Sequence, residues 1–197
     1  MNNSTKWAAA GLAALFVVPI LAVLGFMVVG GGAATAAQPP VPTCSADPSG
    51  AGCPVVNLEG WAKPVIGAQL TSPFGLRLHP ILGVYKLHAG DDLAAKCNSP
   101  IYAAHAGVVI AAGGAGATSQ ADEILIDEGD GTQTAYLHMY PSGIFVAPGD
   151  AVVAGQQIGA VGSAGLSTGC HLHFEAHVNG SPVDPLPFMA ARGVSLP

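Results

Sequence analysis

The stretch His171-Leu172-His173-Phe174-Glu175 decides the fold of this chain, because its two histidines are spaced two residues apart. Successive side chains of a β-strand point to opposite faces of the sheet, so His171, His173 and Glu175 share one face. Leu172 and Phe174 then face a core. The alternation predicts a half-buried strand that presents two imidazoles on its polar face.

Other segments supply further polar groups. His88 and Asp92 are four residues apart, and His138 ends the strand-like run 133–138. The helical zinc motif H-E-x-x-H, with histidines four apart, is absent from the sequence. Zinc in hydrolases takes three protein ligands and leaves one position for water. The combination predicts a zinc hydrolase whose ligands are His88, Asp92 and one of the strand histidines.

Turn-forming residues punctuate the rest of the chain, which contains 27 glycines and 16 prolines. No helical periodicity longer than three turns is visible after residue 60. Short strand-like runs lie at 108–110, 123–126, 133–138, 158–161 and 172–178. The pattern predicts an all-β fold, a compact domain of short antiparallel strands over residues 61–197.

The N-terminal segment 1–37 differs in character from this domain. Residues 7–29 carry no charge and follow Lys6, and a run of this length reaches the roughly 20 residues that span a bilayer. It predicts a hydrophobic helix that acts as a membrane anchor, or a signal peptide cleaved near Ala36 with release of a secreted protein. In both cases the residues beyond 38 are extracytoplasmic.

Residues 38–60 form a predicted linker, rich in proline and small residues at its start. Four cysteines fit an oxidising compartment and allow three pairings. We expect Cys44 to pair with Cys53 around a turn-forming loop, and Cys97 with Cys170. The competing hypothesis makes Cys170 a zinc ligand, but strand parity points its side chain away from the neighbouring histidines.

Charge excludes one class of partner. The formal net charge is −6, and without Lys6 the remaining five basic and twelve acidic residues give −7. Binding to nucleic acid requires a basic surface, so no nucleic-acid partner is expected. The sequence leads to no expectation about oligomeric state.

From about Leu70 to Phe188 the chain resembles the lysostaphin/LytM-type zinc endopeptidases, the M23 family of bacterial cell-wall hydrolases. The resemblance covers nearly all of the predicted domain, and the motifs together are highly specific. They are Thr71–Pro80, the H-x-G-x-D run His88–Asp92, Pro100–Ala104, Tyr136–Met139 and Gly159–Glu175.

The resemblance implies that His88, Asp92 and His173 bind Zn²⁺, while His171 and His138 are catalytic histidines that do not bind the metal. It implies a small antiparallel β-sheet domain with the metal in a groove, and peptidoglycan peptides as the substrate. The activity would be a zinc-dependent endopeptidase that hydrolyses peptide bonds of bacterial peptidoglycan. The alternative is a catalytically silent wall-binding or hydrolase-activating domain of the same fold, which should have lost ligands that are all present here.

Five other side chains have open roles. His79 either lines the groove or has a structural loop role, and Tyr136 either lines the groove or packs in the core. Glu175 either orients a histidine from behind or is structural. His105 and His177 are expected to be ordinary strand-edge or surface residues.

Overall fold

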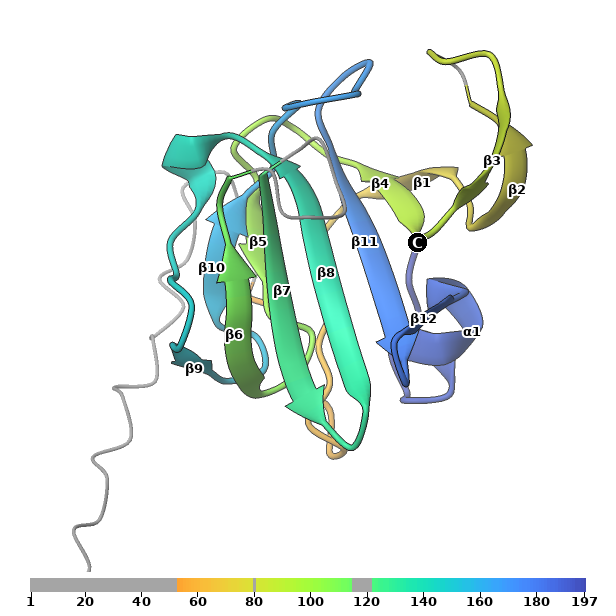
Figure 1. Ribbon diagram of the computed structural model, residues 1–197. Coiled ribbons are helices and arrows are strands. Elements are labelled where there is room, and N and C mark those ends of the chain that lie inside the picture. Colours follow the sequence, from red (N-terminus) through yellow and green to blue (C-terminus); the bar gives the residue numbers. More distant parts are fainter. Residues whose placement is uncertain (1–52, 80, 115–121) are drawn as a thin grey trace, which may run out of the picture. The chain divides into compact units, whose positions relative to one another are not determined.

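An eight-stranded antiparallel sheet organises the described residues 53–79, 81–114 and 122–197 of the computed structural model (Figure 1). Its strands follow the order β1-β4-β11-β8-β7-β6-β9, with β12 paired to β11. They are β1 (Gln69–Ser72), β4 (Asp91–Ala94), β6 (Gly107–Ala112), β7 (Asp122–Gly129), β8 (Thr132–Met139), β9 (Ala151–Val152), β11 (His171–Val178) and β12 (Ser181–Val183).

Smaller elements surround this sheet. The β2–β3 hairpin (Gly75–Leu78 and Tyr85–His88) forms one two-stranded sheet, and β5 with β10 (Pro100–Tyr102 and Gln157–Ala160) forms another. One 3-10 turn lies at Pro141–Gly143 and one short helix, α1, at Pro185–Ala190 in the described part of the chain. The predicted all-β fold is confirmed, and each strand-like run named from the sequence coincides with a strand, the run 158–161 extending one residue past β10.

The predicted alternation holds along β11. Leu172, Phe174 and Ala176 are fully buried, while the histidines alternate with them on the other face. Tyr136 on β8 lies opposite Phe174, with 5.5 Å between the ring centroids, and its hydroxyl accepts a hydrogen bond from the Ala104 amide at 2.7 Å. Tyr136 is therefore a core residue and does not line a groove.

The turn after β11 shows how the sequence specifies this register. Asn179 and Gly180 have φ values of 51° and 76°. Two consecutive positive φ angles in a two-residue loop define the type I′ turn, for which Asn-Gly is the preferred pair. The turn aligns Val178 with Ser181 and returns the chain along β11 as β12.

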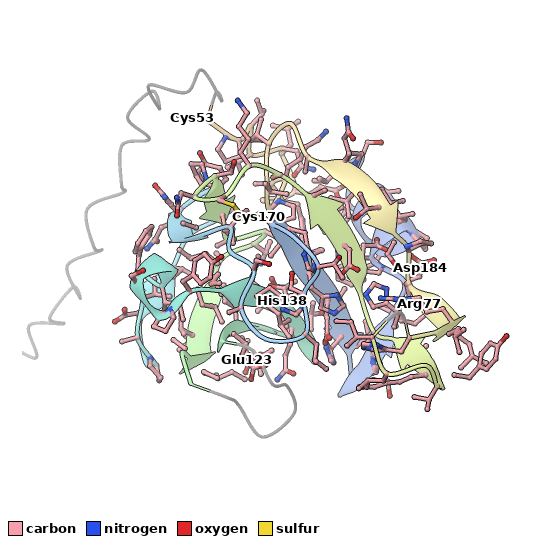
Figure 2. The ribbon with its side chains drawn as sticks, turned by 90° about the horizontal axis from the view of Figure 1, so that it is seen from above. Cys53, Arg77, Glu123, His138, Cys170 and Asp184 are labelled. Atoms are coloured by element: carbon pink, nitrogen blue, oxygen red, sulfur yellow. A yellow bond between two sulfur atoms is a disulfide. The ribbon has the colours of Figure 1, made fainter. Side chains whose placement is uncertain are left out.

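A disulfide joins Cys97 to Cys170, with 5.2 Å between the Cα atoms, as predicted (Figure 2). Cys170 is therefore not a thiolate ligand. Cys44 lies outside the described residues, so its pairing with Cys53 stays a prediction, as does the hydrophobic helix at 7–29. Within the described ranges, no helix has the length and apolar character needed to cross a bilayer.

Candidate active site

Three polar atoms converge where three strands meet. The Nε2 atom of His88 lies 3.1 Å from Oδ1 of Asp92 and 3.0 Å from Nδ1 of His173. Nδ1 of His173 lies 2.8 Å from the same Asp92 oxygen. Because β4 and β11 pair with Asp92 opposite His173, the sheet itself sets these two side chains side by side. His88 reaches them from the end of β3.

This triangle fits a zinc ion. Bonds of about 2.0–2.1 Å in a tetrahedral site place the ligand atoms about 3.3 Å apart, close to the separations found here. The donor set of two imidazoles and one carboxylate is also one that zinc prefers in hydrolases. His88, Asp92 and His173 form the group with metal-binding geometry among the described residues.

Hydrogen bonds on the far side of the two rings set their orientation. Nδ1 of His88 lies 2.9 Å from the Pro73 carbonyl oxygen, which only accepts, so Nδ1 carries the proton and Nε2 faces Asp92. Nε2 of His173 donates to Oε1 of Glu175 at 3.0 Å. Burial opposes the charge on Glu175, but hydrogen bonds from His173 and His177 outweigh it and lower the pKa of Glu175 to about 2. Each ring therefore presents its other nitrogen to Asp92.

The electrostatics of the triangle favour a cation at its centre. Burial opposes the charged forms of Asp92 and His173, yet the hydrogen bonds among these groups dominate. Those from His173 and His88 hold the pKa of Asp92 far below its usual range. Those to Asp92 and Glu175 raise the pKa of His173 to about 9. In the metal-free protein, the Nδ1 proton of His173 thus lies between His173 and Asp92, where a metal ion could bind instead.

Arg77 on β2 contacts the second oxygen of the same carboxylate. Its Nη2 atom lies 3.6 Å from Oδ2 of Asp92, which leaves Oδ1 directed at the histidines. Two residues on, Nδ1 of His79 accepts hydrogen bonds from the amides of Ile81 and Leu82 at 3.2 Å each. His79 therefore shapes the hairpin loop and also lines the groove. Arg77 lies within the Thr71–Pro80 motif, but the sequence alone predicts no role for it.

His138 and His171 lie next to the triangle. Their ring centroids are 4.6 Å apart, and Nε2 of His171 lies 3.5 Å from Oδ1 of Asp92. Nδ1 of His138 donates to the Ala164 carbonyl at 2.7 Å, and Nδ1 of His171 donates to the Gly169 carbonyl at 2.8 Å. In the neutral form of each ring, the Nε2 atom is the nitrogen without a proton. Burial lowers the pKa of His138 to about 4, only partly offset by its bond to Ala164, so this ring is neutral at pH 7.

His138 reaches the site through a β-bulge. Simple alternation along β8 would place it on the side of Tyr136, in the core. The register instead shifts at this point, since Glu123 lies opposite Leu137 while Asp122 lies opposite Met139. His138 has a φ of 70°, a left-handed conformation that is rare for a residue with a Cβ atom. The bulge turns its imidazole to the face that carries His173.

Gly162 makes room for this bulge. A Cβ atom at Gly162 would lie 2.5 Å from the His138 carbonyl oxygen and 2.8 Å from the Tyr140 amide nitrogen. The amide of Ala164 also donates to the His138 carbonyl at 3.1 Å. The sequence shows Gly162 in a turn-like segment, but no sequence signal indicates that it packs behind His138.

A groove of about 800 Å³ opens over these groups. His88, Asp92, His138, His171 and His173 all line it, so the structure brings the five sequence-predicted site residues together. Further polar side chains on its walls are those of Thr71, Ser72, Arg77, His79, Lys86, Glu123, Ser167, Thr168, Glu175 and His177.

Two other histidines, His105 and His177, differ in their position relative to the groove. His105 stacks on Trp61 with 4.5 Å between the ring centroids and does not line the groove, in keeping with an ordinary structural role. His177 was also expected to be an ordinary surface residue. Instead its Nε2 atom lies 2.6 Å from Oε2 of Glu175, and its side chain is 20% exposed on the groove wall.

The chain is similar in sequence to proteins that are named as peptidases. Over 124 residues the chain is 42% identical to the DD-carboxypeptidase/endopeptidase Mpg of Neisseria meningitidis, which covers 63% of this chain and 28% of that protein. It is 35% identical over 121 residues to the peptidoglycan DD-endopeptidase ShyA of Vibrio cholerae, covering 61% of this chain and 27% of that protein. The chain thus spans little more than a quarter of the length of these curated relatives.

Solved structures show the same fold. The catalytic domain of the antimicrobial peptidase lysostaphin from Staphylococcus simulans superposes with a TM-score of 0.55 at 32% identity, over 62% of this chain and 92% of that one. A zinc-containing peptidase from Vibrio cholerae has a TM-score of 0.55 at 30% identity, over 66% of this chain and 44% of that one. Residues 86–185, about half of the sequence, match peptidase family M23. The chain belongs to that family.

Proposed function

We propose that this protein is a zinc-dependent endopeptidase that hydrolyses peptide bonds of bacterial peptidoglycan. The observation that carries the proposal is the triangle of His88 Nε2, Asp92 Oδ1 and His173 Nδ1, whose sides measure 2.8–3.1 Å. Relatives named as peptidoglycan endopeptidases support the substrate class. No ligand or catalytic position is lost, so a catalytically silent domain is not favoured.

In this proposal His88, Asp92 and His173 hold the metal. Bound zinc would lower the pKa of a water molecule to about 7 and polarise the scissile carbonyl. The backs of both ligand rings are held by hydrogen bonds to Pro73 and Glu175, so the donor atoms are already directed inward. Arg77 contacts the other oxygen of this carboxylate, Oδ2, at 3.6 Å.

In this proposal His138 and His171 are the general acid–base residues. Each donates its Nδ1 proton to a backbone carbonyl, so in the neutral ring Nε2 is the basic nitrogen, and both rings line the groove. One of these nitrogens accepts the proton of the attacking water and returns it to the leaving amine. The other histidine, protonated from solvent before the attack, donates a hydrogen bond to the oxygen that gains negative charge. The lowered pKa of His138 keeps its ring neutral at pH 7, so its Nε2 atom is unprotonated when the reaction begins.

The remaining parts of the chain fit an extracytoplasmic enzyme. Residues 1–37 are proposed as the anchor or signal segment, 38–60 as a linker and 61–197 as the catalytic domain. A location outside the membrane places the domain on the side where peptidoglycan lies. The Cys97–Cys170 disulfide is in keeping with such an oxidising compartment.

Four substitutions separate metal binding from catalysis. His173→Ala and Asp92→Ala should lose the zinc, because each removes a ligand. His138→Ala and His171→Ala should keep about one zinc per chain but lose about a hundredfold or more in turnover, as expected for general acid–base groups. Zinc content and the rate of fragment release from purified cell walls should be measured on the same preparations.

His105→Ala, outside the groove, is the matched histidine control and should change neither quantity. Chelation should abolish cleavage, and added zinc should restore it. Full cleavage by the metal-free protein would end the proposal. A His171→Ala protein that loses zinc while His173→Ala retains it would show that the two roles are exchanged.

A further inference from the structure

The face of β11 that carries the proposed ligand His173 bears two further polar side chains. Glu175 and His177 follow His173 at the two-residue period of the strand, so all three side chains lie on one face. Oε1 of Glu175 accepts from Nε2 of His173 at 3.0 Å, and Oε2 lies 2.6 Å from Nε2 of His177. One carboxylate therefore bridges two imidazoles, and the proposed reaction uses neither Glu175 nor His177.

We propose that Glu175 and His177 are a positioning pair that holds His173 in the tautomer and orientation needed to bind zinc. The inference rests on the proposed function and deepens it. His173 can bind a metal through Nδ1 only if its remaining ring proton lies on Nε2. A carboxylate is a strong acceptor for that proton, so Glu175 selects this tautomer and fixes the plane of the ring.

His177 completes the arrangement by holding the second oxygen of the carboxylate. A glutamate side chain has several rotatable bonds, and one hydrogen bond leaves it free to swing about the contact. With Oε1 on His173 and Oε2 on His177, both ends are held. The three side chains share one strand whose opposite face is buried, so their spacing is set by the rigid backbone of β11.

The neighbouring strands leave space for Glu175. On β8 the residue opposite Glu175 is Ala135, whose side chain is small. On the other side, a Cβ atom at Gly90 would lie 2.9 Å from Cγ of Glu175 and 2.3 Å from the Phe174 carbonyl oxygen. Gly90 is the central glycine of the H-x-G-x-D run between His88 and Asp92. The close approach explains why the bend between the two ligands needs a residue without a side chain.

Zinc affinity tests the pair directly. The full chain and its variants should be titrated with Zn²⁺ in competition with a chromophoric chelator. Glu175→Ala should weaken zinc binding about 10- to 100-fold, the range found when the partner of a ligating histidine is removed. Glu175→Gln keeps an acceptor oxygen for His173 and should lose less.

His177 offers a matched comparison on the partly exposed end of the pair. His177→Ala should weaken zinc binding by up to about tenfold, whereas His177→Gln, which restores an N–H donor to Glu175, should bind more tightly than the alanine variant. In the zinc-loaded protein, nitrogen NMR should find the His173 proton on Nε2. That signal should broaden or shift in Glu175→Ala, a change that a merely structural role would not produce. His105→Ala is the control.

The outcomes separate the two proposals. If the unsubstituted chain binds no Zn²⁺, the proposed function fails and this inference falls with it. If it binds Zn²⁺ and folded Glu175→Ala binds equally tightly, only the positioning pair is overturned. Should Glu175→Ala fail to fold, the His177→Ala and His177→Gln pair decides, and equal affinity of these two variants would overturn the inference.

Discussion

Two regions of the molecule deliver the proposed metal ligands, and they are built differently. β11 lies between β4 and β8 in the main sheet, and Leu172 and Phe174 on its inner face are fully buried. The β2–β3 hairpin forms its own two-stranded sheet beside the main one (Figure 1). Its Leu76 and Tyr85 side chains are 74% and 76% exposed. Hydrophobic burial therefore fixes one part of the site and cannot fix the other.

Polar contacts replace the core on the hairpin side. The Phe74 amide donates to Oδ1 of the fully buried Asp91 at 2.8 Å, just before the hairpin begins. His88 donates to the Pro73 carbonyl, and Arg77 contacts Asp92. The site thus combines His173, which is held by the packing of β11, with His88, which is held by a few directed hydrogen bonds. β11 and the β2–β3 hairpin should therefore respond differently to comparable substitutions.

The largest difference should come from the disulfide, which adjoins β11 and not the hairpin. Cys97 and Cys170 are 73 residues apart, and closing a loop of that length stabilises the folded state by about 4 kcal/mol in the chain-entropy estimate. The Cys97→Ser/Cys170→Ser protein should lose up to that amount in denaturant unfolding. Amide exchange should accelerate around residues 95–99 and 163–172. Equal acceleration in the hairpin would contradict the comparison.

A pair of leucine substitutions tests the core contribution with identical chemistry. Leu172→Ala on β11 removes a side chain that is 0% exposed and should lower the free energy of unfolding by about 2–5 kcal/mol. Leu76→Ala on the hairpin removes one that is 74% exposed and should change it by less than about 0.5 kcal/mol. Urea unfolding of both variants gives the two values. A cost above about 2 kcal/mol for Leu76→Ala would show that the hairpin is packed in solution.

Changing pH should act through the β11 ligand. The pKa of His173, raised to about 9 in the metal-free protein, means that its ring is doubly protonated at pH 7. Zinc must displace that proton, so the apparent affinity for zinc should rise about tenfold per pH unit from 7 to 9 and flatten above. Calorimetry in buffers of different ionisation enthalpy should count about one proton released per ion. Affinity that is constant over this range would exclude the raised pKa.

The smallest effect is expected at Arg77. Its guanidinium contact with Asp92 is 3.6 Å long and its side chain is 29% exposed, so the ion pair should contribute no more than about 1 kcal/mol. Arg77→Met should therefore weaken zinc binding only about two- to fivefold in the same chelator titration. Lys86→Met, a change of the residue paired opposite Arg77 on β3, is the control for lost positive charge. A hundredfold loss in Arg77→Met alone would show that this contact holds the hairpin ligand as firmly as packing holds β11.

Features that depend on neighbouring residues can be predicted from the sequence alone. The pleat of a strand has a fixed period of two, so the alternation in residues 171–175 was enough to assign a buried and a polar face. Turn residues such as Asn179-Gly180 marked the strand ends for the same local reason. The motifs that carry the family resemblance also named five of the residues that line the groove. These are properties of short segments, and no long-range contact can change them easily.

How those segments meet depends on contacts between distant parts of the chain. The register that places Asp92 opposite His173 is set by pairing between strands 81 residues apart in sequence, and no local pattern encodes it. The bulge that turns His138 out of the core depends on β7 beside it and on Gly162 behind it. The bond between Glu175 and His177 depends on side-chain conformations within a packed groove. Each is the outcome of competing contacts that exist only once the sheet has formed.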